Sequence, residues 1–277
     1  MKTALLQLNV SDDPGQNLPV TRAYLREAVE AGARFVLTPE VTNCISTSRS
    51  HQNTVLQRED EDQTLAALRA DAAEFGIWLV IGSLGLKTGD ADGRFANRCF
   101  VIDPQGEIIA RYDKIHMFDV DVTPEETWRE SEGYRPGGEA VVAQTEFGTL
   151  GLSICYDLRF PKLHAALAGA GAQILTVPAA FSPVTGAAHW HTLLRARAIE
   201  TGCFVLAPAQ TGTHASVRNK TRSTYGHSLV IAPWGEIQMD AGTAPGVYMT
   251  DLDMGQVEAA RARVPSLQNA RSFDGPK

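Results

Sequence analysis

The chain is poor in cysteine, and its cysteines form no recognisable framework. The 277 residues include only four, and no two of them stand in a CxxC pair. Scattered single thiols are typical of a reducing compartment, so we expect a cytoplasmic protein. No apolar run has the length and composition of a signal peptide or a membrane span, and we expect no membrane partner. The four cysteines are Cys44, Cys99, Cys155 and Cys203.

Positive charge is also in deficit. The chain has 25 Lys and Arg against 32 Asp and Glu, which gives a net charge of -7 and a pI near 5.5. Proteins that bind nucleic acids usually carry a basic face, so we expect no nucleic-acid partner. Hydrophobic residues make up 44% and charged residues 21%, a balance that excludes a disordered or fibrous chain.

The sequence lacks the motifs that hold phosphates or metals. Gly82-Ser83-Leu84-Gly85 is too short for a dinucleotide fingerprint and has no third glycine. His189-Trp190-His191 could suggest metal ligands, but the histidines alternate along the chain and no third ligand stands at a zinc spacing. We therefore expect no metal and no cofactor.

What the chain does have is a regular alternation of strand and helix patterns. Runs of β-branched and aliphatic residues predict buried strands, and apolar residues at helical spacing between them predict helices. This alternation predicts an α/β layered domain. The predicted strands are 3–10, 35–38, 78–84, 98–102, 108–112, 150–155, 174–177, 204–207, 228–231 and 247–252. The predicted helices are 18–32, 65–76, 162–170, 188–201 and 256–263.

Two pairs of segments resemble each other and occur in the same order. Residues 101–108 (VIDPQGEI) recur as 230–237 (VIAPWGEI), each a strand, a turn and a strand, and residues 35–39 (FVLTP) recur as 174–178 (ILTVP). The echoes predict one domain with two similar halves, in which two sheets pack face to face. We place this domain at 1–264 and a tail at 265–277. Residues 114–138 lack periodicity and are expected to be a functional or disordered loop.

Three chemically useful side chains follow the ends of predicted strands. Cys155 ends one strand, and Glu40 and Lys114 lie just past the ends of two others, so one sheet edge could bring them together. A thiol attacks only as thiolate and needs a base nearby. The alternatives at this point are a buried structural cysteine, a solvated acid, a surface lysine, and a Cys–His pair that uses His116 or His227.

The same residues lie in three ordered motifs. These are Thr-Pro-Glu at 38–40, Tyr-Asp-Lys-Ile-His at 112–116 and Ser-Ile-Cys-Tyr-Asp-Leu-Arg-Phe-Pro at 153–161. Together they resemble the nitrilase superfamily of carbon–nitrogen hydrolases along nearly the whole chain. Further segments are similar to the Nit group of amidases, and Gln-Thr-Gly at 210–212 is closer to deaminated glutathione amidases than to ω-amidases. Those segments are 181–190, 193–201, 225–228 and 233–236.

The resemblance implies an αββα sandwich that pairs across helices into a homodimer. It also implies a catalytic triad with Glu40 as base, Lys114 as electrophilic stabiliser and Cys155 as nucleophile. A second glutamate of the family's site matches Glu130. The backbone N–H of Tyr156 is expected to help Lys114 hold the oxyanion.

A thiol-dependent amidase acting through a thioester is the implied activity. The substrate expected from the resemblance is deaminated glutathione, cleaved to 2-oxoglutarate and Cys-Gly. An ω-amidase acting on 2-oxoglutaramate, a thioester-based acyltransferase and an inactive scaffold remain alternatives. Because the amide substrates are small anions, a cation should anchor them, and Arg159, Arg195 and Arg197 are candidates. Substrate binding is assigned to Tyr156, Arg159 and Thr185.

Overall fold

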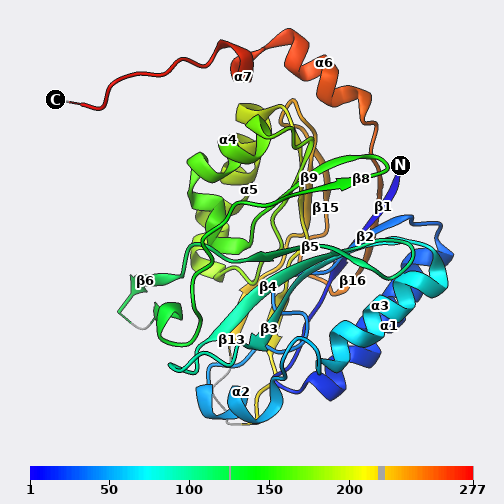
Figure 1. The fold of residues 1–277 in the computed structure, drawn as a ribbon, viewed down its shortest axis with the longest axis vertical. Helices are drawn as coiled ribbons and strands as arrows, with labels where there is room; N and C mark the ends of the chain where they lie inside the picture. The colour runs from blue at the N-terminus through cyan, green and yellow to red at the C-terminus, as the bar shows by residue number, and fades with distance from the viewer. Residues whose placement is uncertain (125, 218–221, 277) are drawn as a thin grey trace.

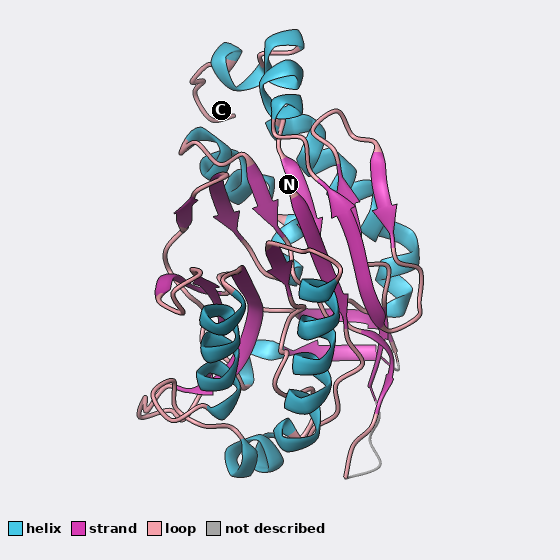
Figure 2. Ribbon diagram, turned by 90° about the vertical axis from the view of Figure 1, so that its right-hand side faces the viewer, coloured by secondary structure: helices cyan, strands magenta, loops and turns pink. Residues whose placement is uncertain are grey.

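The computed structural model describes residues 1–124, 126–217 and 222–276. Two six-stranded sheets lie face to face, and helices cover their outer faces (Figures 1 and 2). The first sheet contains, in spatial order, β16 (Gly246–Asp251), β1 (Lys2–Gln7), β2 (Phe35–Leu37), β3 (Trp78–Lys87), β4 (Phe95–Ile102) and β5 (Ile108–Asp113). The second contains β15 (Ile237–Asp240), β14 (Leu229–Ile231), β11 (Phe204–Ala207), β10 (Ile174–Thr176), β9 (Gly148–Leu152) and β8 (Val142–Thr145). The predicted sandwich is confirmed.

The two sheets share one topology. In each, three parallel strands form the centre, β1-β2-β3 in the first sheet and β9-β10-β11 in the second. One edge carries a single antiparallel strand, β16 or β8, and the other carries an antiparallel hairpin, β4–β5 or β14–β15. The two hairpins are the repeated VI-x-P-x-GEI segments, so the prediction of two similar halves is confirmed.

Helices pack on the sheets where the sequence predicts amphipathic faces. Figure 1 shows α1 (Pro14–Glu30) and α3 (Gln63–Phe75) on one side of the molecule, and α4 (Pro161–Gly169) and α5 (Pro183–Thr201) on the other. Asp13 and Asp62 cap the amino ends of α1 and α3 by accepting backbone N–H bonds. Gly76 and Gly202 end α3 and α5 in the left-handed conformation, which glycine adopts without steric cost.

The short polar elements are the ones that the sequence does not predict. They are α2 (Arg49–Val55), β6 (Asp119–Thr123), β7 (Glu126–Arg129), β12 (Thr211–His214) and β13 (Arg222–Tyr225), together with the edge strand β8 and the terminal α7 (Ser266–Asn269). Residues 114–138, expected to be a functional or disordered loop, contain the antiparallel hairpin of β6 and β7. Glu125 lies outside the described residues. The alternate residues of the hairpin bury no continuous core face, so hydrophobic periodicity cannot reveal it.

The chain after β16 forms α6 (Gly255–Arg263) and α7 (Ser266–Asn269). In Figure 1 the segment beyond α7 runs away from the sandwich. The division into a domain at 1–264 and a tail stays a prediction. Among the described helices, none combines the length and apolarity needed to cross a membrane.

Candidate active site

Cys155 occupies a strained turn between β9 and a short 3-10 helix (Cys155–Arg159). Its φ of 50° lies in the left-handed region, which costs a non-glycine residue about 1–3 kcal/mol unless its surroundings hold it there. The Cys155 N–H donates to the Pro178 carbonyl at 2.9 Å. The buried carboxylate of Asp157 accepts from the Ile154 N–H at 2.9 Å and from the Tyr112 hydroxyl at 2.6 Å. These bonds fix the turn that presents the thiol.

Histidines support this turn and do not pair with the thiol. His116 donates its backbone N–H to Asp157 Oδ1 at 3.0 Å, and its Nδ1 lies 2.7 Å from the same oxygen. The His116 ring stacks on Phe160 with a centroid separation of 3.5 Å. His227 is engaged with Asp240 instead. Neither histidine therefore supplies the base that a Cys–His pair requires.

Glu40 lies three residues after the end of β2 and is held at both of its carboxylate oxygens. Its Oε1 accepts from Lys114 Nζ and from Asn97 Nδ2, both at 2.9 Å. Its Oε2 accepts from the Ala180 N–H at 2.8 Å. The Glu40 carboxylate and the Cys155 thiol also lie close enough for each to shift the pKa of the other. Glu40, which is 4% exposed, is thus held in place by three donors from other elements.

Lys114 follows β5 and joins two carboxylates. Its Nζ lies 2.9 Å from Glu40 Oε1 and 2.9 Å from each carboxylate oxygen of Glu130. The Phe118 N–H donates to Glu130 Oε2 at 2.7 Å, which ties Glu130 to the segment that enters β6. The structure therefore brings Glu40, Lys114, Cys155 and Glu130 together, as the sequence predicts.

Burial and neighbouring charges shift the pKa values of Glu40, Lys114 and Cys155. Burial alone would raise the pKa of the Glu40 carboxyl, but the charges of Lys114 and Arg222 and two hydrogen bonds lower it below its ordinary value. Burial likewise opposes the charge of Lys114, yet Glu130 and Glu40 hold the pKa of its ammonium well above the usual range. Burial and the charge of Glu40 raise the pKa of the Cys155 thiol, and the opposing charge of Lys114 does not offset them. The resting site contains a thiol beside an ionised base, not a thiolate.

A flat pH profile follows from these shifts. Because Glu40 ionises below its usual pKa and the thiol loses its proton only above its own, we expect kcat/KM to stay level from about pH 5 to about pH 9. The same shifts affect stability. The ion pair of Lys114 and Glu40 contributes to the free energy of unfolding at neutral pH. This contribution is lost in acid, as pH falls through the lowered pKa of Glu40, and in strong alkali, as pH rises through the raised pKa of Lys114. The check is kcat/KM against pH at constant ionic strength. An inflection between about pH 6 and 7 would instead indicate a histidine base.

Gly82 allows the chain after β2, which leads to Glu40, to approach the chain after β10, which contacts the Cys155 turn. A Cβ atom at this position would lie 2.1 Å from the Thr38 carbonyl oxygen and 2.5 Å from Pro178 Cβ. Thr38 lies two residues before Glu40, and Pro178 accepts the N–H of Cys155. The absence of a side chain at Gly82 is therefore a condition for the geometry of the site.

The three residues assigned to substrate binding lie around the turn and the start of α5. The Arg159 guanidinium lies 5.9 Å from the Tyr156 ring centroid and 5.4 Å from that of Phe181, and it contacts His189 Nδ1 at 3.2 Å. The buried Oγ1 of Thr185 has no hydrogen-bond partner among the described residues. Their role as substrate ligands stays a prediction.

Two of the three arginines expected to bind the substrate's carboxylate, Arg195 and Arg197, bind other groups of the protein instead. Arg195 donates from Nε to the Gly235 carbonyl at 2.8 Å. Arg197 is buried, donates to the Leu158 carbonyl at 3.0 Å and pairs with Glu200 at 2.6 Å. These contacts hold α5 in place, so of the three candidates Arg159 is the one left to meet a substrate.

Asn97 and Arg222 belong to the site but escape sequence reasoning. Asn97, on β4, donates to Glu40 and lies 3.4 Å from Glu130 Oε1. Arg222, on β13, donates to the Ala180 carbonyl at 2.7 Å and lies 4.7 Å from the Trp128 ring centroid. The one available signal is a polar Asn97 within the apolar strand FANRCFVI, because a buried amide needs partners.

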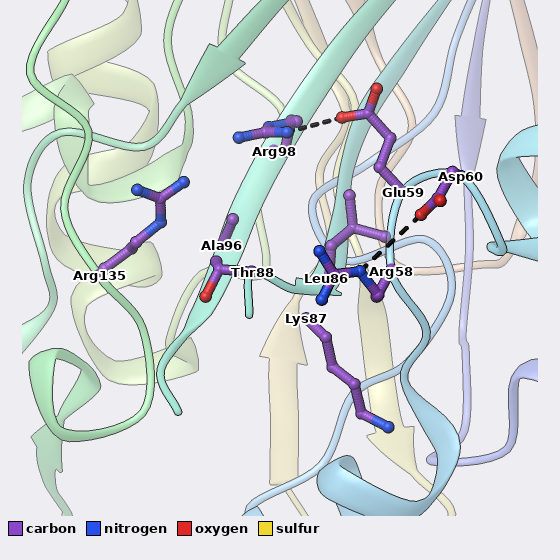
Figure 3. Close-up of a pocket in the computed structure, with 9 residues that line it drawn as sticks. All are labelled: Arg58, Glu59, Asp60, Leu86, Lys87, Thr88, Ala96, Arg98 and Arg135. Atoms are coloured by element: carbon purple, nitrogen blue, oxygen red, sulfur yellow. Dashed lines mark hydrogen bonds and ion pairs between the residues drawn. The ribbon is translucent and has the colours of Figure 1, made fainter. Parts of the chain in front are cut away.

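A separate cavity of about 180 Å³ lies beside the other face of β4 (Figure 3). Ala96 and Arg98 line it, and since side chains alternate along a strand they point away from the side that Asn97 occupies. Arg98 is paired there with Glu59 at 2.6 Å. Since the cavity lies on the opposite face of β4 from Asn97, we assign it no part in the chemistry.

The fold and the buried thiol beside a carboxylate are those of a thiol-dependent hydrolase. A family model described as carbon-nitrogen hydrolase matches residues 2–262. The protein therefore belongs to the carbon–nitrogen hydrolase family, and the predicted membership of the nitrilase superfamily is confirmed.

Sequence relatives match along nearly the whole chain. The deaminated glutathione amidase of Yersinia enterocolitica is 38% identical over 269 residues, which cover 97% of this chain and 92% of that protein. The human deaminated glutathione amidase is 36% identical over 273 residues, which cover 97% and 81%. The predicted class, a hydrolase of carbon–nitrogen bonds in amides, is confirmed.

Solved structures of similar proteins share the sandwich. The NitFhit protein of C. elegans matches with a TM-score of 0.88 and 34% identity over 98% of this chain and 65% of that longer one. A nitrilase superfamily member of Saccharomyces cerevisiae matches with a TM-score of 0.83 and 29% identity over 96% and 94%. An amidase from Nesterenkonia sp. AN1, at a TM-score of 0.76 and 28% identity over 96% and 98%, carries acrylamide added at its active-site cysteine. These matches confirm the prediction of a thiol-dependent amidase.

Proposed function

We propose that the protein hydrolyses the amide bond of deaminated glutathione, with Cys155 as nucleophile, Glu40 as general base and Lys114 as stabiliser of negative charge. The observation that carries the proposal is the set of 2.9 Å contacts that join the Lys114 ammonium to two carboxylates beside the thiol. The relatives named deaminated glutathione amidase support the choice of substrate.

Acylation begins with attack of the Cys155 sulfur on the amide carbonyl carbon. Because the pKa of the thiol is raised, its proton passes to Glu40 as the C–S bond forms. The carbonyl oxygen becomes an oxyanion, which Lys114 and the Tyr156 backbone N–H stabilise by about 3–4 kcal/mol per donor. Glu40 then gives its proton to the nitrogen as the C–N bond breaks, and Cys-Gly leaves with a free amino group.

Deacylation uses the same base on water. Glu40 takes a proton from water as the water oxygen attacks the 2-oxoglutaryl thioester. The C–S bond breaks, the proton passes to sulfur, and 2-oxoglutarate leaves with the thiol restored. Glu130 acts through Lys114, whose ammonium it contacts with both oxygens, and is therefore a positioning residue.

The substrate's carboxylates require a cation, and Arg159 is proposed to supply it. Its guanidinium is partly exposed beside Tyr156, which directly follows the nucleophile. The unpartnered hydroxyl of Thr185, in the first turn of α5, offers a further hydrogen bond. A helix amino terminus also favours negative charge nearby.

The test is release of 2-oxoglutarate from deaminated glutathione and, in parallel, from 2-oxoglutaramate. We expect a higher kcat/KM with deaminated glutathione, and no product above the uncatalysed rate with Cys155→Ala. Preference for 2-oxoglutaramate would overturn the substrate and indicate an ω-amidase. Transfer of the acyl group to an added amine in preference to water would indicate an acyltransferase.

Replacing Arg159 by glutamine should weaken substrate binding more than it slows chemistry. Loss of one charge-assisted contact to a carboxylate costs about 1.5–3 kcal/mol, so KM should rise roughly 10- to 100-fold with a smaller change in kcat. Steady-state kinetics on deaminated glutathione measure both. Arg195→Gln is the matched control, since Arg195 bonds a backbone carbonyl; equal KM changes in the two variants would remove Arg159 from the site.

We also propose that the enzyme works in the cytoplasm as a homodimer. The four cysteines are free and buried, as suits a reducing compartment. Cytoplasmic fractionation and the molar mass in solution test the two parts separately.

A further inference from the structure

Three metal-ligating side chains that stand far apart in the sequence meet beside α5. His191 lies on α5, His227 precedes β14, and Asp240 ends β15. His191 Nε2 lies 3.0 Å from Asp240 Oδ2, and His227 Nδ1 lies 2.9 Å from Asp240 Oδ1. All three donor atoms lie within 4.8 Å of one another. We call this group the His191–His227–Asp240 cluster.

The spacing of the cluster suits one divalent ion. Bonds from zinc to nitrogen or oxygen are about 2.0–2.2 Å, so donors in a tetrahedral site lie about 3.3 Å apart. His191 Nε2 and His227 Nδ1 lie 3.0 and 3.2 Å from the same oxygen, Asp240 Oδ2, which is close to this value. The side chains of His191 and His227 are 30% and 23% exposed, so the rings have room to turn their donor nitrogens toward a common centre. Two imidazoles and a carboxylate are donors that zinc and its neighbours in the first transition row accept.

Backbone contacts already orient two of the three ligands. The Gly242 N–H donates to Asp240 Oδ1 at 2.9 Å, and the His227 N–H donates to the Gly242 carbonyl at 2.7 Å. His227 is held at a φ of 55°, and its carbonyl accepts from Trp190 Nε1 on α5 at 2.8 Å. Contacts of this kind fix ligand orientation in metal sites.

Electrostatics also favour a cation at this place. The Asp240 carboxylate faces one ring nitrogen of each histidine. For these nitrogens to bind an ion, each imidazole carries its proton on its other ring nitrogen, and His191 Nε2 and His227 Nδ1 then present lone pairs to the ion.

We propose that the His191–His227–Asp240 cluster binds one first-row transition-metal dication of the zinc type, with water in the remaining coordination positions. The ion would clamp α5 against the β14–β15 hairpin. The expectation of no metal considered only spacing around His189-Trp190-His191, whereas Asp240 comes 49 residues after His191. The proposal is independent of the proposed amidase mechanism.

The test is Co²⁺ titration of the untagged, chelator-stripped protein, followed by visible absorption, with Zn²⁺ calorimetry in parallel. We expect one ion per chain and a spectrum of nitrogen and oxygen ligands without a thiolate charge-transfer band. His191→Ala and Asp240→Asn should each weaken Zn²⁺ binding by about tenfold or more. His189→Ala, which removes a histidine two residues away on the same helix, should leave binding unchanged.

Thermal unfolding adds a readout that does not depend on activity. Zn²⁺ should raise the Tm of the parent protein and of His189→Ala, but not that of the two cluster variants. Asp240→Asn keeps an oxygen for the Gly242 N–H, so it separates metal binding from loop structure. Absence of saturable binding, equal affinity in all variants, or a thiolate band would each overturn the proposal.

Discussion

Replacing Cys155 by alanine or serine is expected to abolish turnover and leave the fold intact. Without a sulfur nucleophile no thioester forms, and the loss of kcat should be on the order of 10⁵-fold or more. Serine keeps the shape, but its hydroxyl is a much weaker acid than a thiol, and a carboxylate base of lowered pKa cannot activate it efficiently. Measurement of 2-oxoglutarate release, with circular dichroism to verify folding, checks this expectation.

Cys44→Ser is the matched control for the nucleophile. Cys44 is also free and buried, its thiol donates to the Asp12 carbonyl at 3.5 Å, and a serine can make the same bond. Burial and two nearby aspartates raise the pKa of the Cys44 thiol to about 12, and no base accompanies it in the role that Glu40 has beside Cys155. Activity should persist in this variant. In the parent protein iodoacetamide should modify Cys155 selectively, because Glu40 can take the thiol proton as the new C–S bond forms. Turnover by Cys155→Ala, or equal labelling of both thiols, would contradict the assignment.

The sheets and their main helices could be predicted because their burial leaves periodic patterns. The strands of the two sheet centres are short apolar runs, and the repeated hairpins at 101–108 and 230–237 reveal the two halves. The hairpin β6–β7 could not be predicted, since its residues are charged or partly exposed and bury no continuous face. Glu130, which follows that hairpin, was identified by resemblance and not by pattern.

The main residues of the site could be predicted from the sequence, but the protonation state of the Cys155 thiol could not. Strand ends predict that Glu40, Lys114 and Cys155 meet. The charge of Lys114 favours a thiolate at Cys155, but burial and the charge of Glu40 outweigh it. The protonation states of Glu40 and Cys155 depend on the exclusion of solvent and on the N–H donors of Asn97 and Ala180, which come from other elements. No single motif contains that information.

Replacing Lys114 by methionine is expected to damage both activity and stability. Methionine fills a similar volume, but it leaves the carboxylates of Glu40 and Glu130 close together without the cation that both contact. Removal of one partner from a buried pair costs about 3–5 kcal/mol of unfolding free energy. The loss of an oxyanion donor alone lowers kcat by about 10²- to 10³-fold, and protonation of the base should lower it further. Urea unfolding and steady-state kinetics measure the two effects, and Lys162→Met, at an exposed lysine on α4, should change neither.

The double variant Lys114→Met/Glu130→Gln separates the loss of stability from the loss of activity. If the instability of Lys114→Met comes from two buried carboxylates without a cation, adding Glu130→Gln removes one charge and should recover part of the unfolding free energy. Activity should not return, because the ammonium that stabilises the oxyanion is still missing. Glu40→Gln should lose activity and keep stability. The variant lacks the base, but Lys114 keeps Glu130 as its partner. A double variant as unstable as Lys114→Met would show that packing around the lysine, and not its charge, holds this part of the site together.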